Sequence, residues 1–281
     1  FTKSKYAIAI VNGTNALHIA LLAVGVRSGD EVLVPALTFV ASANSISYCN
    51  ATPHFIDSDI KNLQIDYKKL DAYLEKISIK KDNFSINKKT GKKITAIMPV
   101  HTFGHSANIE LLLKISKKYN LKIVEDAAEG LGSFYKDKHV GNYGSVGVMS
   151  FNGNKIITTG GGGMIITNNK SIAKNIRHLS TTSKVKHQWR YIHDSIGYNY
   201  RMPNINAALG FAQMKNIKQF IKNKRSIFNI YNRNFKEIKG VLLFKEPSRA
   251  RSNYWLQTII LEKKYSHLRD DILRETNKLN I

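Results

Sequence analysis

The stretch that decides the fold is SFNGNKIITTGGGG, residues 150–163, which sets a single lysine, Lys155, before four consecutive glycines. Glycine loses more backbone freedom on folding than any other residue. Such a run inside an apolar pattern therefore indicates a sharp turn or the close approach of another group. A lysine at the edge between a strand and a loop is most often a surface residue. The segments on either side decide between these interpretations.

Short apolar runs alternate with helix-like segments along the N-terminal part of the chain. Helices of ten or more residues between short apolar strands are typical of α/β proteins. We therefore predict an α/β fold with a mainly parallel central sheet flanked by helices. The predicted strands cover residues 7–11, 31–35, 53–57, 94–100, 121–126, 145–151 and 163–167, and the predicted helices cover residues 14–24, 39–48, 67–77 and 109–119.

The pattern changes in the C-terminal part. One long helix is predicted at about residues 204–235, followed by strands at 241–244 and 255–261 and a last helix. We predict a large domain, 1–205, and a linking helix with the start of a smaller C-terminal α+β domain, 206–281. That second domain looks incomplete. We expect the chain to be a fragment that lacks residues at both ends.

The chain of 281 residues carries a net charge of +23, which invites a nucleic-acid-binding interpretation. However, its lysines are spread over many predicted helix faces, and the densest basic stretch, residues 80–93, is predicted to be a solvated loop. Compositional bias is therefore the favoured explanation. No apolar run predicts a membrane span, and the first residues lack a signal-peptide pattern. A single cysteine, Cys49, excludes an internal disulfide and favours a cytoplasmic protein.

The segment NGTNAL, residues 12–17, follows a predicted strand and opens a helix. Gly13 permits a tight turn. The free N–H groups and partial positive charge of a helix N-terminus suit a phosphate group. Plain N-capping of the helix by Asn12 or Thr14 is the alternative, and it is favoured when this segment is taken alone.

The segment VEDAAEGLGS, residues 124–133, sets Glu125, Asp126 and Glu129 at the carboxyl end of a strand. That end of an open α/β sheet faces the ligand crevice, and a buried carboxylate there needs a cation or hydrogen-bond donors. A helix N-cap at Asp126 is the alternative, at even odds.

These three signals are compatible with one cofactor. A phosphate cradle, a strand-end carboxylate and a lysine on a glycine-rich loop are what pyridoxal 5'-phosphate needs. The phosphate anchors the cofactor, the carboxylate keeps the pyridine nitrogen protonated, and the lysine forms an imine with the aldehyde. Two histidines, His101 and His105 in HTFGH, have no third ligand at a recognisable spacing, so we predict no metal site.

Over nearly its whole length the chain resembles the DegT/DnrJ/EryC1/StrS family of sugar aminotransferases. It most resembles the LegC branch, which has four glycines where many relatives have GEGG. The resemblance implies the aspartate aminotransferase type I fold of pyridoxal phosphate-dependent transferases, with the cofactor in the large domain. It rests on segments in family order: GTNALHIALL, GDEVLVPALTFVASANSISY, PVHTFGH, VEDAAEGLGS, SFNGNKIITTGGGGMIIT, HLSTTSK and GYNYRMPNINAALGFAQM.

By that resemblance, Lys155 is similar to the lysine that forms the Schiff base, and Asp126 to the partner of the pyridine nitrogen. Glu129 occupies the position near the ring and its 3-hydroxyl group. Relatives that are sugar 3-dehydratases have histidine in place of the lysine, so Lys155 favours an aminotransferase. The glycine tract is expected to let backbone pass close to the cofactor pocket without side chains blocking it.

The remaining cofactor contacts follow from the same motifs. Thr14, Asn15 and Ser150 are expected to hold the phosphate, and Phe39, in ALTFVAS, to stack on the cofactor ring. Asn199, in GYNYR, resembles the residue that reaches the phosphate from the neighbouring subunit. A homodimer with shared active sites is therefore expected.

The implied reaction moves an amino group from glutamate to a nucleotide-linked 4-keto-6-deoxy sugar. Such a reaction is a step of amino sugar biosynthesis, and the amino sugar is expected to be used in lipopolysaccharide. A UDP-4-keto-6-deoxy-N-acetylhexosamine is the first choice of substrate, and a GDP-linked 4-keto-6-deoxymannose is the alternative. His101, His193 and Arg201 lie in family-like segments near the expected sugar site. A non-catalytic truncated relative and a basic nucleic-acid-binding protein stay open as alternatives.

Overall fold

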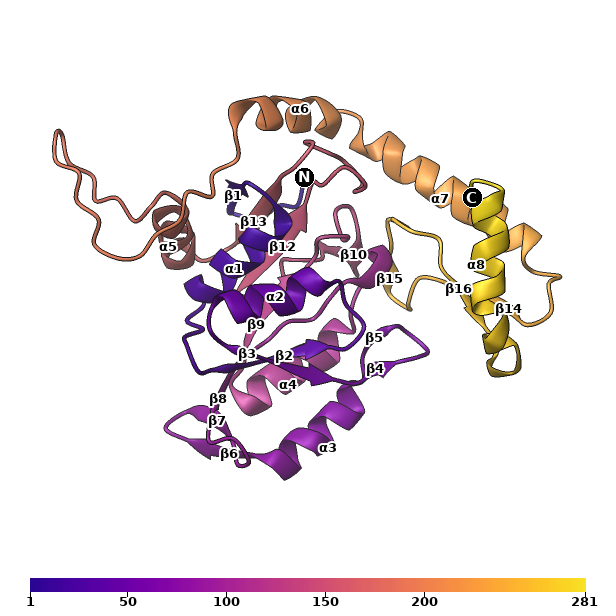
Figure 1. Ribbon diagram of the computed structural model, residues 1–281, viewed down its shortest axis with the longest axis horizontal. Coiled ribbons are helices and arrows are strands. Elements are labelled where there is room, and N and C mark those ends of the chain that lie inside the picture. Colours follow the sequence, from indigo (N-terminus) through magenta and orange to yellow (C-terminus); the bar gives the residue numbers. More distant parts are fainter.

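The computed structural model describes residues 1–281 and has a mixed, mostly parallel sheet at its centre (Figure 1). Strand β13 is antiparallel to both of its neighbours, β1 and β12, and the other main pairings along the sheet are parallel. The predicted α/β class with a mainly parallel sheet is confirmed. In spatial order the sheet contains β1 (Tyr6–Ile10), β13 (Gly163–Thr167), β12 (Val146–Ser150), β9 (Lys122–Asp126), β8 (Lys93–Ile97), β2 (Glu31–Pro35) and β3 (Thr52–Ile56).

Helices cover both faces of this sheet because its strands are apolar on both sides. In β2, Val32 and Val34 join one buried cluster, whereas Leu33 between them joins another, as the period of two along a strand requires. The first cluster packs under α1 (Gly13–Ala23), α2 (Val40–Tyr48) and α5 (Lys170–Ser180), and the second packs under α3 (Tyr67–Ile77) and α4 (Ile109–Tyr119).

Two features of the N-terminal part differ from the sequence prediction. The basic stretch expected as a solvated loop contains most of a hairpin, β6 (Ser78–Lys81) and β7 (Phe84–Asn87), and β7 pairs with the edge of β8. There the Nζ atom of Lys93, at the start of β8, lies 3.3 Å from the centroid of the Phe84 ring in β7. This contact between neighbouring strands stabilises the lysine within the sheet. Helix α5 was not predicted.

The C-terminal part begins with two helices in place of the single predicted one. Helix α6 (Asn204–Met214) ends before α7 (Ile217–Asn234), and Asn216, with φ −103° and ψ 1°, is the non-helical residue from which the second helix starts. The strand predicted at 255–261 forms only at β16 (Ile259–Leu261), which pairs with β14 (Val241–Leu243). The proposed boundary at 205/206 falls within the first turn of α6, and the division into two domains stays a prediction.

The residues before β16 are instead buried against the N-terminal part. Strand β15 (Ala250–Arg251) pairs with β10 (Phe134–Tyr135), and Ser252 to Trp255 follow it into the interior. The remaining short elements are β4 (Ser58–Asp59), β5 (Gln64–Ile65), β11 (Lys138–His139), the 3₁₀ helices η1 (Thr102–Gly104) and η2 (Lys263–Leu268), and helix α8 (Arg269–Lys278).

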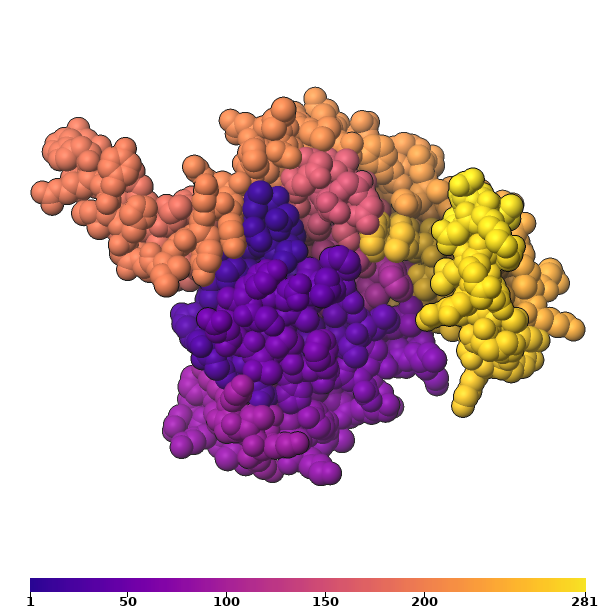
Figure 2. All heavy atoms as spheres, viewed as in Figure 1, coloured from indigo at the N-terminus to yellow at the C-terminus, as the bar shows by residue number.

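An extended segment between α5 and α6, residues 181–203, projects from the body of the protein (Figures 1 and 2). Its exposed side chains include Trp189, Tyr191 and Ile196. We call it the arm. None of the helices is both long and apolar enough to cross a membrane.

Candidate active site

A cavity of about 350 Å³ lies at the carboxyl ends of the parallel strands. This is the edge of an open α/β sheet at which ligands bind, because strand ends and helix N-termini converge there. The structure brings together in it most of the residues that the sequence singled out. Those that line the cavity are Thr14, Phe39, Asp126, Glu129, Ser150 and Lys155.

Lys155 points into this cavity and not toward solvent. Its side chain is only 14% exposed, so the ordinary expectation of a surface lysine does not hold here. Its Nζ atom lies 3.3 Å from Oε1 of Glu129 and 3.8 Å from the centroid of the Trp255 ring. The turn after β12 sets this direction, since the Lys155 N–H donates to the carbonyl of Asn152.

Asp126 ends strand β9 and is 5% exposed. Ser42, from helix α2, donates its hydroxyl to Oδ2 at 2.7 Å, and the Ala128 N–H donates to Oδ1 at 3.1 Å. Burial raises the pKa of Asp126, and these two donors offset the effect in part. Such a carboxylate gains by facing a cationic group, which is what a protonated pyridine nitrogen offers.

Glu129 is the second carboxylate of the cavity. The Phe103 N–H donates to Oε2 at 2.6 Å, while Oε1 faces the lysine amine. Burial raises the pKa of Glu129, and the Lys155 charge and the Phe103 N–H act against that rise. Lys155 therefore has one carboxylate within contact distance, that of Glu129. The Phe103 N–H holds this carboxylate in place through Oε2, the oxygen that does not face the lysine.

The N-terminus of α1 forms a tight cradle against the end of β12. A Cβ atom on Gly13 would lie 2.9 Å from the Cβ of Ser150, so glycine is required for this approach. Asn12 is the N-cap, and its Oδ1 accepts the Asn15 N–H at 2.8 Å. The first N–H groups of a helix have no intrahelical partner. Those of Gly13 and Thr14 therefore suit a phosphate, whereas Asn15 does not line the cavity.

The glycine tract was expected to pass close to the cofactor pocket, but none of its four residues lines the cavity. Gly163 passes against the N-cap: a Cβ atom there would lie 2.6 Å from the Asn12 carbonyl oxygen. Gly160 has φ +75°, which favours glycine, but a Cβ on Gly161 would meet nothing within 4 Å. A Cβ on Gly162 would collide with the Thr159 hydroxyl oxygen, so the last two glycines make close approaches, and only Gly163 approaches the N-cap of α1.

Three predicted residues lie on the arm or at its base and not in the cavity. Asn199 and His193 are exposed, and the His193 Nδ1 donates to the Thr182 carbonyl at 2.7 Å. Arg201 lines a different surface cavity. Within this one chain, therefore, none of the three meets Lys155.

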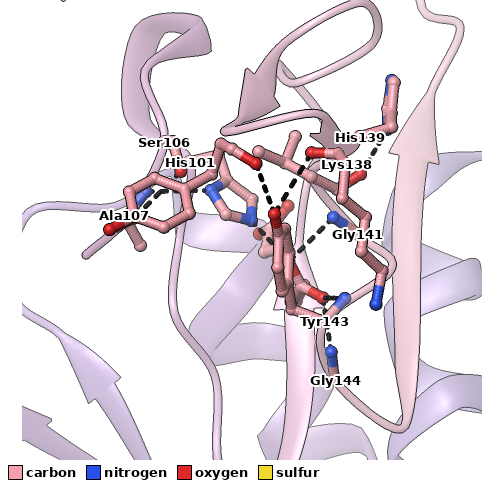
Figure 3. A network of polar contacts seen from close by, with 12 residues as sticks. His101, Ser106, Ala107, Lys138, His139, Gly141, Tyr143 and Gly144 are labelled. Atoms are coloured by element: carbon pink, nitrogen blue, oxygen red, sulfur yellow. Dashed lines mark hydrogen bonds and ion pairs between the residues drawn. The ribbon is translucent and has the colours of Figure 1, made fainter. Parts of the chain in front are cut away.

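His101 does not line the cavity and has no exposed surface. The Ala107 N–H donates to its Nδ1 at 3.1 Å, so the proton sits on Nε2, which donates to Glu125 at 2.9 Å. Figure 3 shows this ring beside the loop that contains Gly141, Tyr143 and Gly144. Since the ring does not reach the cavity, His101 does not lie where a sugar would bind.

Glu125 is the centre of that buried network. Its carboxylate accepts the N–H groups of Gly141, Tyr143 and Gly144 at 2.6–2.7 Å as well as His101 (Figure 3). Burial acts to raise the pKa of Glu125, but His101 and these N–H groups more than offset it, so the pKa lies below its usual value. The network fixes the end of β9 and thus the position of Asp126.

Sequence reasoning missed two residues of the site. Ser42, which orients Asp126, is one of several small residues in α2 and carries no motif of its own. Trp255 lines the cavity from a segment predicted as a strand. Its place depends on long-range packing that no local pattern reveals.

The sequence matches the DegT/DnrJ/EryC1/StrS aminotransferase family over residues 1–281. It is 41% identical over 275 residues to a GDP-perosamine synthase of Escherichia coli O157:H7, covering 96% of this chain and 70% of that one. EpsN of Bacillus subtilis strain 168, named as a pyridoxal phosphate-dependent aminotransferase, is 36% identical over 277 residues, covering 99% of this chain and 68% of EpsN.

Among solved structures, PseC of Helicobacter pylori, an aminotransferase involved in the biosynthesis of pseudoaminic acid, has a similar fold. The TM-score is 0.85 at 26% identity, covering 98% of this chain and 70% of PseC. The type I transferase fold expected from the sequence is therefore confirmed. The chain belongs to the DegT/DnrJ/EryC1/StrS aminotransferase family and is a pyridoxal phosphate-dependent sugar aminotransferase.

Proposed function

We propose that this aminotransferase moves an amino group from glutamate to the 4-keto group of a 6-deoxy sugar linked to a nucleoside diphosphate. One observation carries the assignment of the site: a largely buried lysine amine, the buried Asp126, the partly buried Glu129 and the glycine cradle share one cavity. Each separate feature has an ordinary structural explanation, but their convergence at the strand ends fits a cofactor that has a phosphate, a ring nitrogen and an aldehyde.

The residues present fit that cofactor at each end. The N-terminus of α1 with Ser150 would hold its phosphate, since the absence of a side chain on Gly13 lets the first turn of α1 lie close to Ser150. Asp126 would face the ring nitrogen, and Phe39, which lines the cavity and is 71% exposed, would cover a ring face. When bound, pyridoxal phosphate supplies an electron sink for the charge left on carbon after a proton departs.

The chain's own contribution to the reaction is to move and hold protons. Asp126, oriented by Ser42, favours the protonated form of a nitrogen that faces it. The Lys155 amine, once free, is the base placed to take a proton from one carbon and return it to the carbon on the other side of the shared nitrogen. Glu129 holds that amine in the cavity between these transfers.

The nucleotide is the finer part of the proposal. The similarity to a GDP-perosamine synthase supports a GDP-linked 4-keto-6-deoxymannose as substrate. The four-glycine tract, which resembles the LegC branch, supports the UDP-4-keto-6-deoxy-N-acetylhexosamine expected from the sequence.

A parallel assay of the two sugars with glutamate tests the function and the nucleotide together. Formation of 2-oxoglutarate and of the amino sugar is followed by mass spectrometry. We expect turnover with one of the two sugars, and the GDP-linked one is favoured. No 2-oxoglutarate with either sugar, from protein that binds the cofactor, would contradict the proposed substrate class.

We also propose that the active protein is a homodimer, with the arm of one subunit against the cavity of the other. Asn199 and Arg201 flank Tyr200, whose carbonyl accepts the Val11 N–H at 2.8 Å. This hydrogen bond holds the base of the arm against the end of β1. Tyr198 and Tyr200 pack inward, which leaves Asn199 outward and exposed. Large exposed side chains on the arm and α6 support such contact: Trp189, Tyr191, Ile196, Ile205 and Phe211.

Sedimentation of the unmodified protein and of the Ile205→Asp variant tests the dimer. We expect the parent to sediment as a dimer and the variant to dissociate, because a charge would replace an exposed apolar side chain. A monomeric parent with full activity would contradict the shared site.

A further inference from the structure

The segment from Ser252 to Trp255 joins the C-terminal part to the active-site wall. Asn253 has no exposed surface, and its Nδ2 donates to the carbonyls of Glu129 at 2.7 Å and Leu131 at 2.9 Å. Its Oδ1 accepts the Trp255 N–H at 2.8 Å. The amide side chain is therefore fully engaged, and it fixes the direction in which the chain enters the cavity wall.

Trp255 is held at both ends of its side chain. Its Nε1–H donates to the Asn154 carbonyl at 2.7 Å, one residue before Lys155. The ring is 6% exposed and packs in the buried cluster that contains Ile156 and Ile221. One face is left for the cavity, where the Nζ of Lys155 lies 3.8 Å from the ring centroid.

We propose that Trp255 is a positioning residue that, together with Glu129, holds the ammonium group of Lys155 whenever this amine is not covalently engaged. The inference rests on the proposed role of Lys155 and adds the residue that keeps it in place. The C-terminal segment thereby completes a cavity whose other lining residues all lie between Asn12 and Lys155.

The physical reason is that a free lysine has many rotamers and a strong preference for water. Confining its long side chain costs conformational entropy. A cation over an indole face is attracted by the negative charge of that face, and more strongly where water is excluded. The Glu129 carboxylate at 3.3 Å adds a Coulomb attraction. The two contacts together oppose the loss of the amine to water, and removal of either one should make the amine more accessible to reagents in solution.

A spectroscopic measurement on the unmodified sequence tests the contact without any mutation of the wall. Protein with isotope-labelled lysine, freed of cofactor by dialysis, is examined by NMR. The ring current of Trp255 should displace the ε-methylene signals of Lys155 upfield, as the Phe84 ring should displace those of Lys93. We expect one displaced signal of the parent to be absent from Lys155→Met. A spectrum that loses no displaced signal in Lys155→Met would overturn the proposal.

Chemical labelling of the cofactor-free protein then separates the aromatic face from its bulk. We expect acetylation of Lys155 at fixed pH to be about 3- to 30-fold faster in Trp255→Leu, which keeps an apolar side chain without an aromatic face. Trp255→Phe should give an intermediate rate. Lys224, whose Nζ donates to the Trp255 carbonyl at 3.0 Å, is the internal control and should label equally in all three proteins.

The outcomes keep this inference apart from the function itself. Equal labelling of Lys155 in the folded parent and Trp255→Leu proteins overturns the role of the ring, even if Lys155 is the covalent lysine. A faster rate together with a displaced signal supports it, even if another lysine binds the cofactor. If Trp255→Leu does not fold, Trp255→Met serves in its place, and the NMR result on the parent still decides.

Discussion

The two walls of the cavity are built in different ways. The strand-end wall comes from Gly13, Asp126 and Ser150, which follow directly from strands of one sheet. The C-terminal wall is Trp255, which reaches the same cavity from about 100 residues later in the chain, through a buried segment with little regular structure. The strand-end wall carries the groups that the chemistry needs, and the C-terminal wall restrains them. Changes to the first should therefore abolish turnover, whereas changes to the second should reduce it.

The largest effect is expected for Lys155→Ala. Loss of the only amine in the cavity should lower kcat by about 10²–10⁴-fold or more, because a positioned base alone contributes this factor. The fold should persist, since the lysine lies at a cavity edge. Steady-state kinetics and circular dichroism measure the two properties. Lys89→Ala, at an exposed lysine, is the matched control. Near-normal turnover in Lys155→Ala would refute the site.

Asp126→Asn should separate activity from stability. We expect a loss of turnover of about 10²-fold, because the amide cannot favour a protonated ring nitrogen. Without cofactor, however, the variant should be more stable than the parent at neutral pH. Burial raises the pKa of Asp126 in the folded state. Its ionisation therefore costs stability as the pH rises from the usual value of about 4 through the raised one.

Thermal unfolding of the two cofactor-free proteins at several pH values checks this sign. The variant's advantage should be small near pH 4 and should grow toward neutrality, by about 2–4 °C for each kcal/mol. A parent that is more stable than the variant at neutral pH would show that Asp126 is not penalised by burial in the way that its surroundings indicate.

Two glycines of the same tract give a matched pair for the cradle. Gly163→Ala should destabilise the protein by about 1–3 kcal/mol, because its Cβ would lie 2.6 Å from the Asn12 carbonyl oxygen. It should also weaken cofactor binding, since the N-cap of α1 must shift. Gly161→Ala should be nearly neutral, as its Cβ would meet no atom within 4 Å. Denaturant unfolding distinguishes them, and equal stability would contradict the cradle geometry.

The smallest effect on turnover is expected for Ser42→Ala, because Ser42 acts on the cavity only through Asp126. The variant lacks the hydroxyl that donates to Asp126 at 2.7 Å. A hydrogen bond to a charged group contributes about 1.5–3 kcal/mol to the free energy of unfolding, so the variant should be less stable by that amount. We expect turnover to fall about tenfold with little change in KM. Ser47→Ala, at an exposed serine of the same helix, is the control. A larger loss than in Asp126→Asn would contradict the order of effects.

The sequence predicted the strand-end wall well because its residues are local to their motifs. Asp126 ends an apolar strand and Lys155 precedes a glycine tract. The residues next to each one are therefore enough to predict where it lies in an α/β fold. Strand β2 and helices α3 and α4 were predicted with their observed bounds. The combination of three weak signals identified the cofactor, and comparison with relatives supports that result.

The rest depends on contacts that are distant in sequence. Trp255 was predicted at the start of a strand because WLQTIIL is mostly apolar. Asn253 instead bonds this segment to the N-terminal part through the carbonyls of Glu129 and Leu131. His101 was expected near the sugar, but its motif does not reveal the partner Glu125 that buries it. In both places a hydrogen bond across many residues decided the outcome.

The most direct test of the central claim is the attachment site of the cofactor. The purified protein is incubated with pyridoxal phosphate, its visible spectrum is recorded, and the protein is reduced with borohydride and mapped by peptide mass spectrometry. The account predicts a visible absorption band that reduction abolishes and a single reduced adduct, on Lys155. An adduct on another lysine, or one scattered over surface lysines, would contradict it.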